Sequence, residues 1–148
     1  MEVRRLRAGD EQLAIEAIET LKPEEERDGN VASQEHMRRV LESDENYLIV
    51  ACEAGRPTGF LVAHRFPRVD RDRYMVYLYE IEVEQAFRRR GVGTRMIDLL
   101  KNVCREDQVM EIWVGTEEDN IPAKALYKAT GAEEEPHYYR EYVYSQGR

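Results

Sequence analysis

Apolar residues recur along the chain at two spacings, and together these predict an alternation of strands and helices. Between Asp10 and Pro23, and over 91–107, apolar side chains return every three or four residues, as on one face of a helix. Other segments are dense in aromatic and β-branched residues, as strands are. The expected strands are 3–7, 46–52, 58–66, 74–84, 109–114 and 137–144, and the remaining expected helices follow Ser33 and span 120–129.

The order of these elements, β-α-α-β-β-β-α-β-α-β, predicts an α+β fold. The residues between 46–52 and 58–66 suit a hairpin, which makes the first half of the sheet antiparallel. The strand–helix–strand unit from 74 to 114 requires a parallel pair, so we expect a mixed, mostly antiparallel sheet flanked by about four helices. The chain has no repeat or Pro/Gly-rich linker, so we expect a single domain over 1–148.

The net charge of the chain limits the kinds of ligand that it is expected to bind. The chain has 148 residues with 30 acidic and 22 basic side chains, a net charge of −8 and a pI near 5.0. Nucleic acid is therefore not the expected partner, because binding phosphates needs a basic face. There is no apolar run of membrane-spanning length, no secretory signal pattern, and the two cysteines lack metal-ligand spacing. We expect a cytoplasmic, metal-free protein with room for a cationic ligand.

A glycine turn stands between the richest strand and the longest helix. In Arg88-Arg89-Arg90-Gly91-Val92-Gly93, two glycines let backbone N–H groups converge where the helix has its positive end. This favours an anion site suited to a pyrophosphate. The dinucleotide fingerprint fails, because Met96 stands where its third glycine belongs. A tight strand-to-helix turn with a solvated arginine run explains the spacing equally well.

A second motif follows downstream, Asn120-Ile-Pro-Ala-Lys-Ala-Leu-Tyr127 with Gly131 beyond it. The pair R-x-x-G-x-G and N-x-x-A-x-x-L-Y-x-x-x-G, in this order and on these elements, resembles the GCN5-related N-acetyltransferase (GNAT) superfamily. The resemblance covers nearly the whole chain. It implies a sheet whose parallel pair is splayed by a bulge, and direct acetyl transfer from acetyl-coenzyme A to an amine, without a covalent enzyme intermediate.

The resemblance also implies residue roles. The arginine–glycine turn would hold the pyrophosphate, and the main chain of Ile81 and Val83 would hold the pantetheine arm and face the thioester carbonyl. Tyr127 would donate a proton to the leaving thiolate, although a tyrosine packed for bulk is the alternative. Asn120 would bond the pantetheine amide, or simply cap its helix. The implied turn residues are Arg88, Arg89, Arg90, Gly91, Val92, Gly93 and Thr94.

The acceptor amine arrives protonated, so carboxylates are expected beside it. Alternation places Glu80, Glu82 and Glu84 on one strand face, which a solvated edge strand would also explain. The segments 76–83 and 123–127 look like the type I aminoglycoside 3-N-acetyltransferases, with Tyr79 and Glu80 standing where those have tyrosine and aspartate. Glu80 is then the expected base or amine anchor, directly or through a water, with Tyr79 and Glu82 beside the substrate.

Acidic runs add to this picture. Glu117-Glu118-Asp119 and Glu133-Glu134-Glu135 flank the helix that bears Tyr127, so they are expected at the mouth for a cationic amine, although such runs are usually solvated faces. A third run, Glu24-Glu25-Glu26 with Asp28, lies in the segment after Pro23, which is expected to be a polar loop. Trp113 is expected in the core. An aminoglycoside, with a role in antibiotic resistance, is the first choice of substrate. A polyamine, a protein amine, or an acetyl-coenzyme A sensor without activity are the alternatives. The tyrosine-rich tail 138–144 is a candidate homodimer contact.

Overall fold

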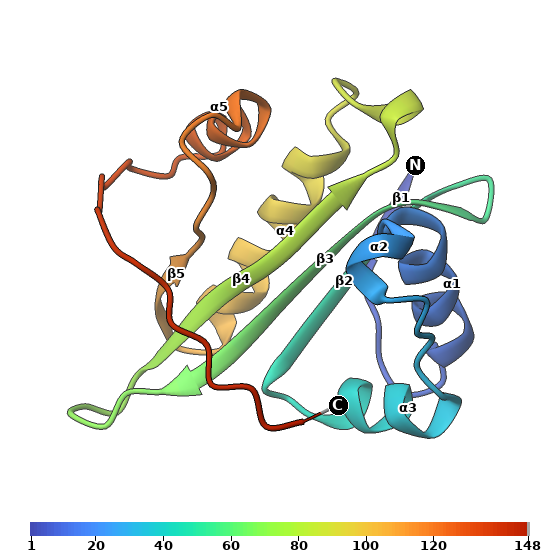
Figure 1. Cartoon of the computed structure of the whole chain (residues 1–148), viewed down its shortest axis with the longest axis horizontal. Coiled ribbons are helices and arrows are strands. Elements are labelled where there is room, and N and C mark those ends of the chain that lie inside the picture. The colour runs from blue at the N-terminus through green and yellow to red at the C-terminus, as the bar shows by residue number, and fades with distance from the viewer. Residues whose placement is uncertain (148) are drawn as a thin grey trace.

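The computed structural model, which describes residues 1–147, contains one five-stranded sheet with helices on both faces (Figure 1). The strands pair in chain order, antiparallel from β1 to β4 and parallel between β4 and β5, so the expected mixed sheet is confirmed. The strands are β1 (Glu2–Arg5), β2 (Asn46–Glu53), β3 (Arg56–Pro67), β4 (Tyr74–Val83) and β5 (Val109–Trp113). The helices are α1 (Glu11–Leu21), α2 (Glu24–Arg27), α3 (Gln34–Glu42), α4 (Val92–Glu106) and α5 (Ile121–Ala129), with a 3-10 turn at Gln85–Phe87.

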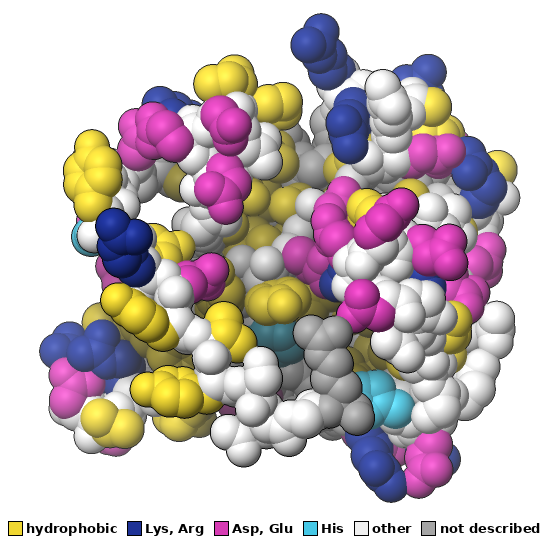
Figure 2. All heavy atoms as spheres, in the orientation of Figure 1, with side chains coloured by type: hydrophobic (Ala, Val, Ile, Leu, Met, Phe, Trp, Pro, Cys, Tyr) yellow, Lys and Arg dark blue, Asp and Glu magenta, His cyan; other side chains and the backbone are white. Residues whose placement is uncertain are grey.

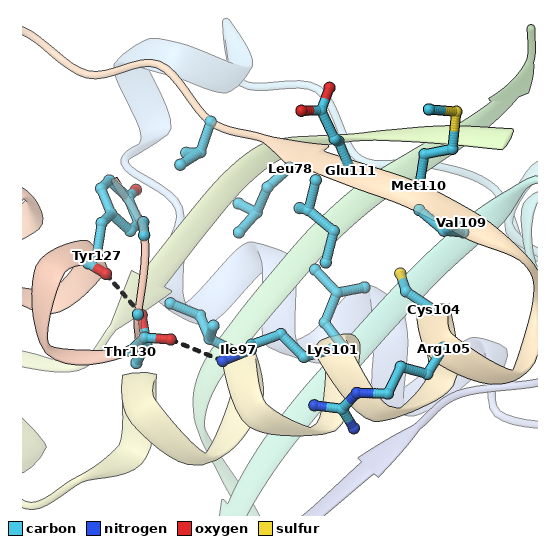
Figure 3. Close-up of a pocket in the computed structure, with 15 residues that line it drawn as sticks. Leu78, Ile97, Lys101, Cys104, Arg105, Val109, Met110, Glu111, Tyr127 and Thr130 are labelled. Carbon is cyan, nitrogen blue, oxygen red and sulfur yellow. Dashed lines mark hydrogen bonds between the residues drawn. The ribbon is translucent and has the colours of Figure 1, made fainter. Parts of the chain in front are cut away.

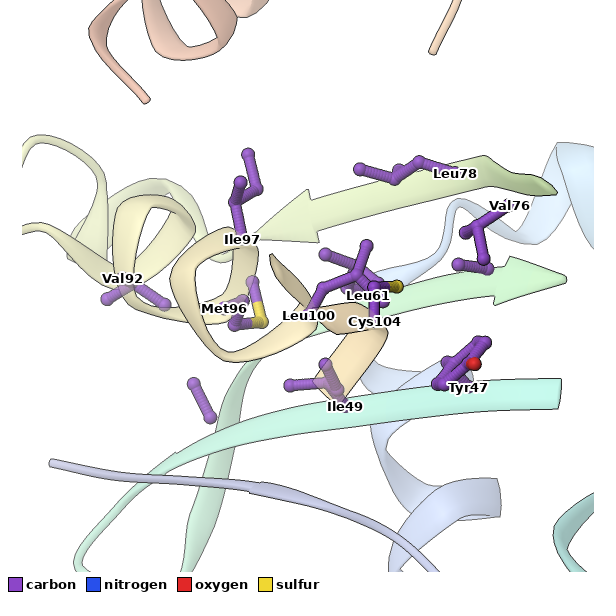
Figure 4. Close-up of a cluster of buried hydrophobic side chains, with 12 residues drawn as sticks. Tyr47, Ile49, Leu61, Val76, Leu78, Val92, Met96, Ile97, Leu100 and Cys104 are labelled. Atoms are coloured by element: carbon purple, nitrogen blue, oxygen red, sulfur yellow. The ribbon is translucent and has the colours of Figure 1, made fainter. Parts of the chain in front are cut away.

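Each face of the sheet has its own core. On one face α4 packs through Met96, Ile97 and Leu100 against Ile49 and other buried strand residues (Figure 4). On the other face α1 and α3 cover β2 and β3, with Ala14, Ala17, Met37 and Leu41 buried. The helical spacing of apolar residues in the sequence predicted which face of each helix is buried. The second face is covered only in part, because α1 and α3 stop short of β4 and β5 (Figure 1).

Three expected features differ in the structure. The polar segment after Pro23 contains the short helix α2. The segment 137–144 is not a strand, and its tyrosines are exposed. Neither of its faces would be wholly apolar, and a strand without a partner ladder is unstable. Finally β5 is an edge strand rather than a buried one, so Trp113 is 48% exposed and stacks near Phe66, with ring centroids 6.1 Å apart.

Candidate functional site

The parallel strands β4 and β5 separate halfway along β4. Their pairing ends at Tyr77 opposite Trp113, and a bulge in β4 follows at once, since Val62 and Ala63 of β3 face Glu80 and Leu78. Tyr79 is the extra residue. A bulge bends its strand and increases the local twist. The second half of β4 therefore lacks a β5 partner, which is the splayed arrangement that the family resemblance implied.

The unpaired side of β4 presents the main chain of Ile81 and Val83. The Glu84 N–H donates to the Thr58 carbonyl at 2.8 Å, which fixes the groups that face β3. Because such groups alternate in an antiparallel ladder, those of Glu82 also face β3, and those of Ile81 and Val83 face the gap. The Val83 carbonyl accepts a bond from Arg88 Nε at 3.2 Å. An extended ligand in the gap meets main-chain groups at both positions.

The glycine turn lies at the end of the same gap. Gly91, in the left-handed region with φ +79°, is the N-cap of α4, and no side chain caps this helix. The N–H groups of Val92, Gly93 and Thr94 are the first three of α4, which have no acceptor within the helix. Arg90 lies over the Phe87 ring at 5.2 Å, beside the turn. These residues fit a diphosphate, because the helix end and the arginines favour negative charge.

Gly93 also allows the glycine turn to pack closely against α5. A Cβ at Gly93 would lie only 3.0 Å from Leu126 Cδ2, so no larger residue fits without displacing Leu126. Leu126 precedes Tyr127, the residue implied as the proton donor. The close approach of α4 and α5 thus sets the place of Tyr127 relative to the turn.

Tyr127 lies at the α5 end of a cavity of about 300 Å³ between α4, β5 and α5 (Figure 3). Leu78, the last β4 residue before the bulge, lines the same cavity. Burial raises the pKa of the Tyr127 phenol, and Tyr77 and the Glu82 carboxylate raise it further. The α5 end is fixed by Thr130, whose hydroxyl donates to the Tyr127 carbonyl and whose carbonyl accepts from Lys101 Nζ. Tyr127 is therefore a protonated phenol within electrostatic range of the β4 carboxylates.

The carboxylates of β4 have different environments. Glu80 Oε1 accepts a hydrogen bond from Lys22 Nζ at 3.1 Å, and both side chains are about one-fifth exposed. Burial raises the pKa of Glu82, and Glu26 and Glu80 raise it further by like-charge repulsion. Glu84 pairs with Arg56 at 3.1 Å. Glu80 is thus engaged with an ammonium, and the Glu82 carboxyl has a pKa above its ordinary value.

Other predicted site residues lie around this centre. Asn120 caps α5, its Oδ1 accepting from the Ala123 N–H at 3.2 Å, which is the structural alternative considered for it. Tyr79 lies beside His64, with ring centroids 5.9 Å apart, and is 59% exposed. Glu117 and Glu118 line a second cavity of about 240 Å³ with Tyr127, whereas Asp119 does not. Lys124 partly neutralises this group, pairing with Glu118 at 3.3 Å.

Figure 2 shows a hollow between the part of the molecule that carries α5 and the part that carries α1–α3, with carboxylate side chains on both sides. Glu26 belongs to the third acidic run noted in the sequence, although that run was not assigned to the acceptor mouth. Sequence reasoning missed two residues on this face, namely Lys22 and Tyr77. Their positions follow from the packing of α1 and from the β4–β5 register, and no local motif marks them. Exposed Trp113, expected in the core, lies opposite Tyr77.

Residues 1–147 lack two features that other kinds of protein have. They show no cluster of three or more histidine, cysteine, aspartate or glutamate side chains able to hold a metal ion. In the same residues, every helix is too short or too polar to cross a lipid bilayer.

The comparisons agree with this geometry. Residues 13–132 match the Acetyltransferase (GNAT) family. An aminoglycoside acetyltransferase from an uncultured soil metagenomic sample is 30% identical, with a TM-score of 0.83 over 97% of this chain and 98% of that one. A second such enzyme from soil, solved with sisomicin, shares the fold at 20% identity and a TM-score of 0.82, over 97% and 96%.

A curated relative, an uncharacterized N-acetyltransferase of Methanocaldococcus jannaschii, is 29% identical over 103 residues. These residues are 67% of this chain but only 44% of the relative, so the chain spans less than half of that protein. The family match covers most of the chain and coincides with the splayed strands, the glycine turn and Tyr127. The chain belongs to the GNAT family of acetyltransferases.

Proposed function

We propose that this chain transfers an acetyl group from acetyl-coenzyme A to an amine of a polycationic small molecule, an aminoglycoside in the first place. One observation carries the proposal: the open main chain of β4 leads from the glycine turn to a place between Tyr127 and the carboxylates Glu80 and Glu82. A thioester donor and an amine acceptor can meet there from opposite sides of the sheet.

The residues at the start of α4 and along β4 fit acetyl-coenzyme A, the acetyl donor. The N–H groups that begin α4, with Arg88, Arg89 and Arg90 beside them, would bind its diphosphate. The outward main-chain groups of Ile81 and Val83 would bind its extended arm as a neighbouring strand does. When bound, the donor supplies an acetyl thioester. The N–H of Ile81 or Val83 then stabilises negative charge on the acyl oxygen.

The acceptor side contains the groups that handle protons. Glu80 binds an ammonium in this structure, which suits an anchor for the acceptor. Glu82, whose pKa is raised, suits the removal of a proton from the attacking amine, directly or through a water. Tyr127, whose pKa is also raised, remains protonated at neutral pH and can donate its proton to the departing thiolate.

An aminoglycoside matches the charge and shape of the hollow. Its several ammonium groups complement Glu26, Glu80 and Glu82, and the exposed rings of Tyr77 and Tyr79 offer contact to sugar rings. The soil enzyme at 30% identity is an aminoglycoside acetyltransferase, which supports the same class. We propose the 3-amino group as the site of transfer, on the resemblance of 76–83 to the type I 3-N enzymes.

The test is thiol release from acetyl-coenzyme A with kanamycin, gentamicin and spermidine as acceptors, followed by NMR of the product. Turnover of an aminoglycoside with sequential kinetics supports the proposal. Turnover of spermidine alone makes the chain a polyamine acetyltransferase, and coenzyme A binding without thiol release from a wide amine panel makes it a sensor. Glu80→Gln is expected to reduce turnover while coenzyme A binding is preserved. Gly91→Trp, in the turn itself, is expected to abolish that binding.

A further inference from the structure

Lys22 places an ammonium of the chain itself on the acceptor side of β4. It is the C-cap residue of α1, and its Nζ donates to Glu80 Oε1 at 3.1 Å. Only about one-fifth of either side chain is exposed, so the pair is largely withdrawn from solvent. The contact joins the end of α1 to the strand that binds both substrates in the proposed function.

The backbone fixes where this ammonium starts. Lys22 precedes Pro23, which restricts it to extended backbone, and its ψ is 129°. Its carbonyl accepts a bond from Arg27 Nε at 3.4 Å. The four-carbon side chain is flexible beyond this anchored backbone. The ammonium can therefore leave Glu80 without any movement of α1.

The surroundings are those expected for a bound ammonium. Burial raises the pKa of the Glu82 carboxyl, the charges of Glu26 and Glu80 raise it further, and Arg88 and then Lys22 lower it. The chain has only four lysines among its 22 basic residues. The other three are tied to α5 or its flanks, with Lys101 on the Thr130 carbonyl, Lys124 on Glu118 and Lys128 on Glu134. Lys22 alone among them contacts β4.

We propose that Lys22 occupies the ammonium subsite of the acceptor at Glu80, and that an acceptor amine binds by displacing it. The inference rests on the proposed function, whose anchor it defines. An acceptor with one amine exchanges one ammonium for another at Glu80 and gains little. An acceptor with several amines also pairs with Glu82 and Glu26, so it outcompetes Lys22. Lys22 thus lowers the affinity for every acceptor, and only an acceptor with further charge contacts binds tightly in spite of this cost.

The experiment measures binding of kanamycin and of propylamine by calorimetry, without acetyl-coenzyme A, at low salt. Lys22→Met removes the competing charge and keeps the apolar stem, and Lys22→Arg keeps the charge. Arg38→Met is the matched control, since it removes one positive charge from the exposed Arg38–Glu42 pair on α3. We expect Lys22→Met to tighten kanamycin binding about fivefold, the ratio typical of one partly screened ion pair. Propylamine should gain by about the same factor, because it too binds only when Lys22 has left Glu80.

The pairing partner gives a second readout. In a Glu80→Gln background, Lys22→Met should change kanamycin affinity less than twofold, because the shared site is gone. Lys22→Arg and Arg38→Met should bind as the wild type does. In turnover assays Lys22→Met should lower the KM of the acceptor without raising kcat.

The outcomes separate this inference from the proposed function. Unchanged or weaker kanamycin binding in Lys22→Met overturns the inference. So does a gain in kanamycin affinity from Lys22→Met that is as large in the Glu80→Gln background as in the wild type. Absence of kanamycin binding by both the wild type and Lys22→Met also overturns it. Tighter binding without acetyl transfer to any acceptor supports the subsite and refutes the proposed function. Acetyl transfer with no response to Lys22→Met leaves the function standing and refutes the subsite.

Discussion

Replacing Gly93 with valine tests whether the contact between α4 and α5 positions the site. The new Cβ would lie 3.0 Å from Leu126 Cδ2, closer than ordinary van der Waals contact, and valine adds two methyl groups beyond it. Overpacking of this kind costs about 2–3 kcal/mol. For a chain of this length, that lowers Tm by roughly 6–9 °C.

Thermal unfolding followed by circular dichroism measures this loss, and calorimetry with coenzyme A measures its functional side. We expect weaker coenzyme A binding, because Gly93 provides one of the N–H groups that begin α4. Leu126→Ala in the same protein makes room, so the double variant should be about 1–2 kcal/mol more stable than the sum of the single changes. A wild-type Tm for Gly93→Val, or simple additivity with Leu126→Ala, would refute the reasoning.

Three further changes have expected results. Tyr127→Phe should lower kcat about a hundredfold in the thiol-release assay while calorimetry shows unchanged coenzyme A affinity, since the change removes only the hydroxyl that we propose as the proton donor. Glu82→Gln should raise Tm at pH 7 and leave it unchanged well below pH 4.5, the ordinary pKa of the group. The reason is that a raised carboxyl pKa makes the folded state bind more protons, so wild-type stability falls as pH rises from that value through the folded pKa. Tyr47→Phe removes a 2.8 Å bond from a buried hydroxyl to Asp107 and should cost about 2 kcal/mol in thermal or denaturant unfolding.

The elements were readable from the sequence wherever local periodicity and packing agree. The helical spacing of Met96, Ile97 and Leu100 predicts the face that α4 buries, and the density of β-branched residues predicts β4. The tail 137–144 misled the prediction, because composition alone favours a strand there and the partner that a strand needs is not encoded locally. Trp113 misled it for a related reason, since the sequence does not show that β5 ends the sheet.

The residues of the candidate site likewise fall into those that a local motif predicts and those that only tertiary packing brings together. The turn at Gly91 and the motif ending at Tyr127 are contiguous, so sequence reasoning found them. The pairing of Lys22 with Glu80 joins residues 58 positions apart, and it depends on the angle at which α1 crosses the sheet. Glu26 reaches the same carboxylates because α2 forms where a loop was expected. Such contacts follow from tertiary packing, which one sequence does not display.

The position of the bulge, by contrast, follows from the spacing of apolar residues in the sequence of β4. Its residues on the α4 face are Val76, Leu78, Ile81 and Val83, so the spacing of two is interrupted once by a spacing of three. A regular strand would put residues 80 and 82 on the buried face after Leu78. The extra residue, Tyr79, reverses that alternation, which keeps Ile81 and Val83 against α4 and turns Glu80 and Glu82 to the opposite face, where we propose that the acceptor binds. One inserted position thus bends β4 away from β5 and gives the gap its carboxylates, so both binding sites of the proposed function depend on a single irregularity of the sheet.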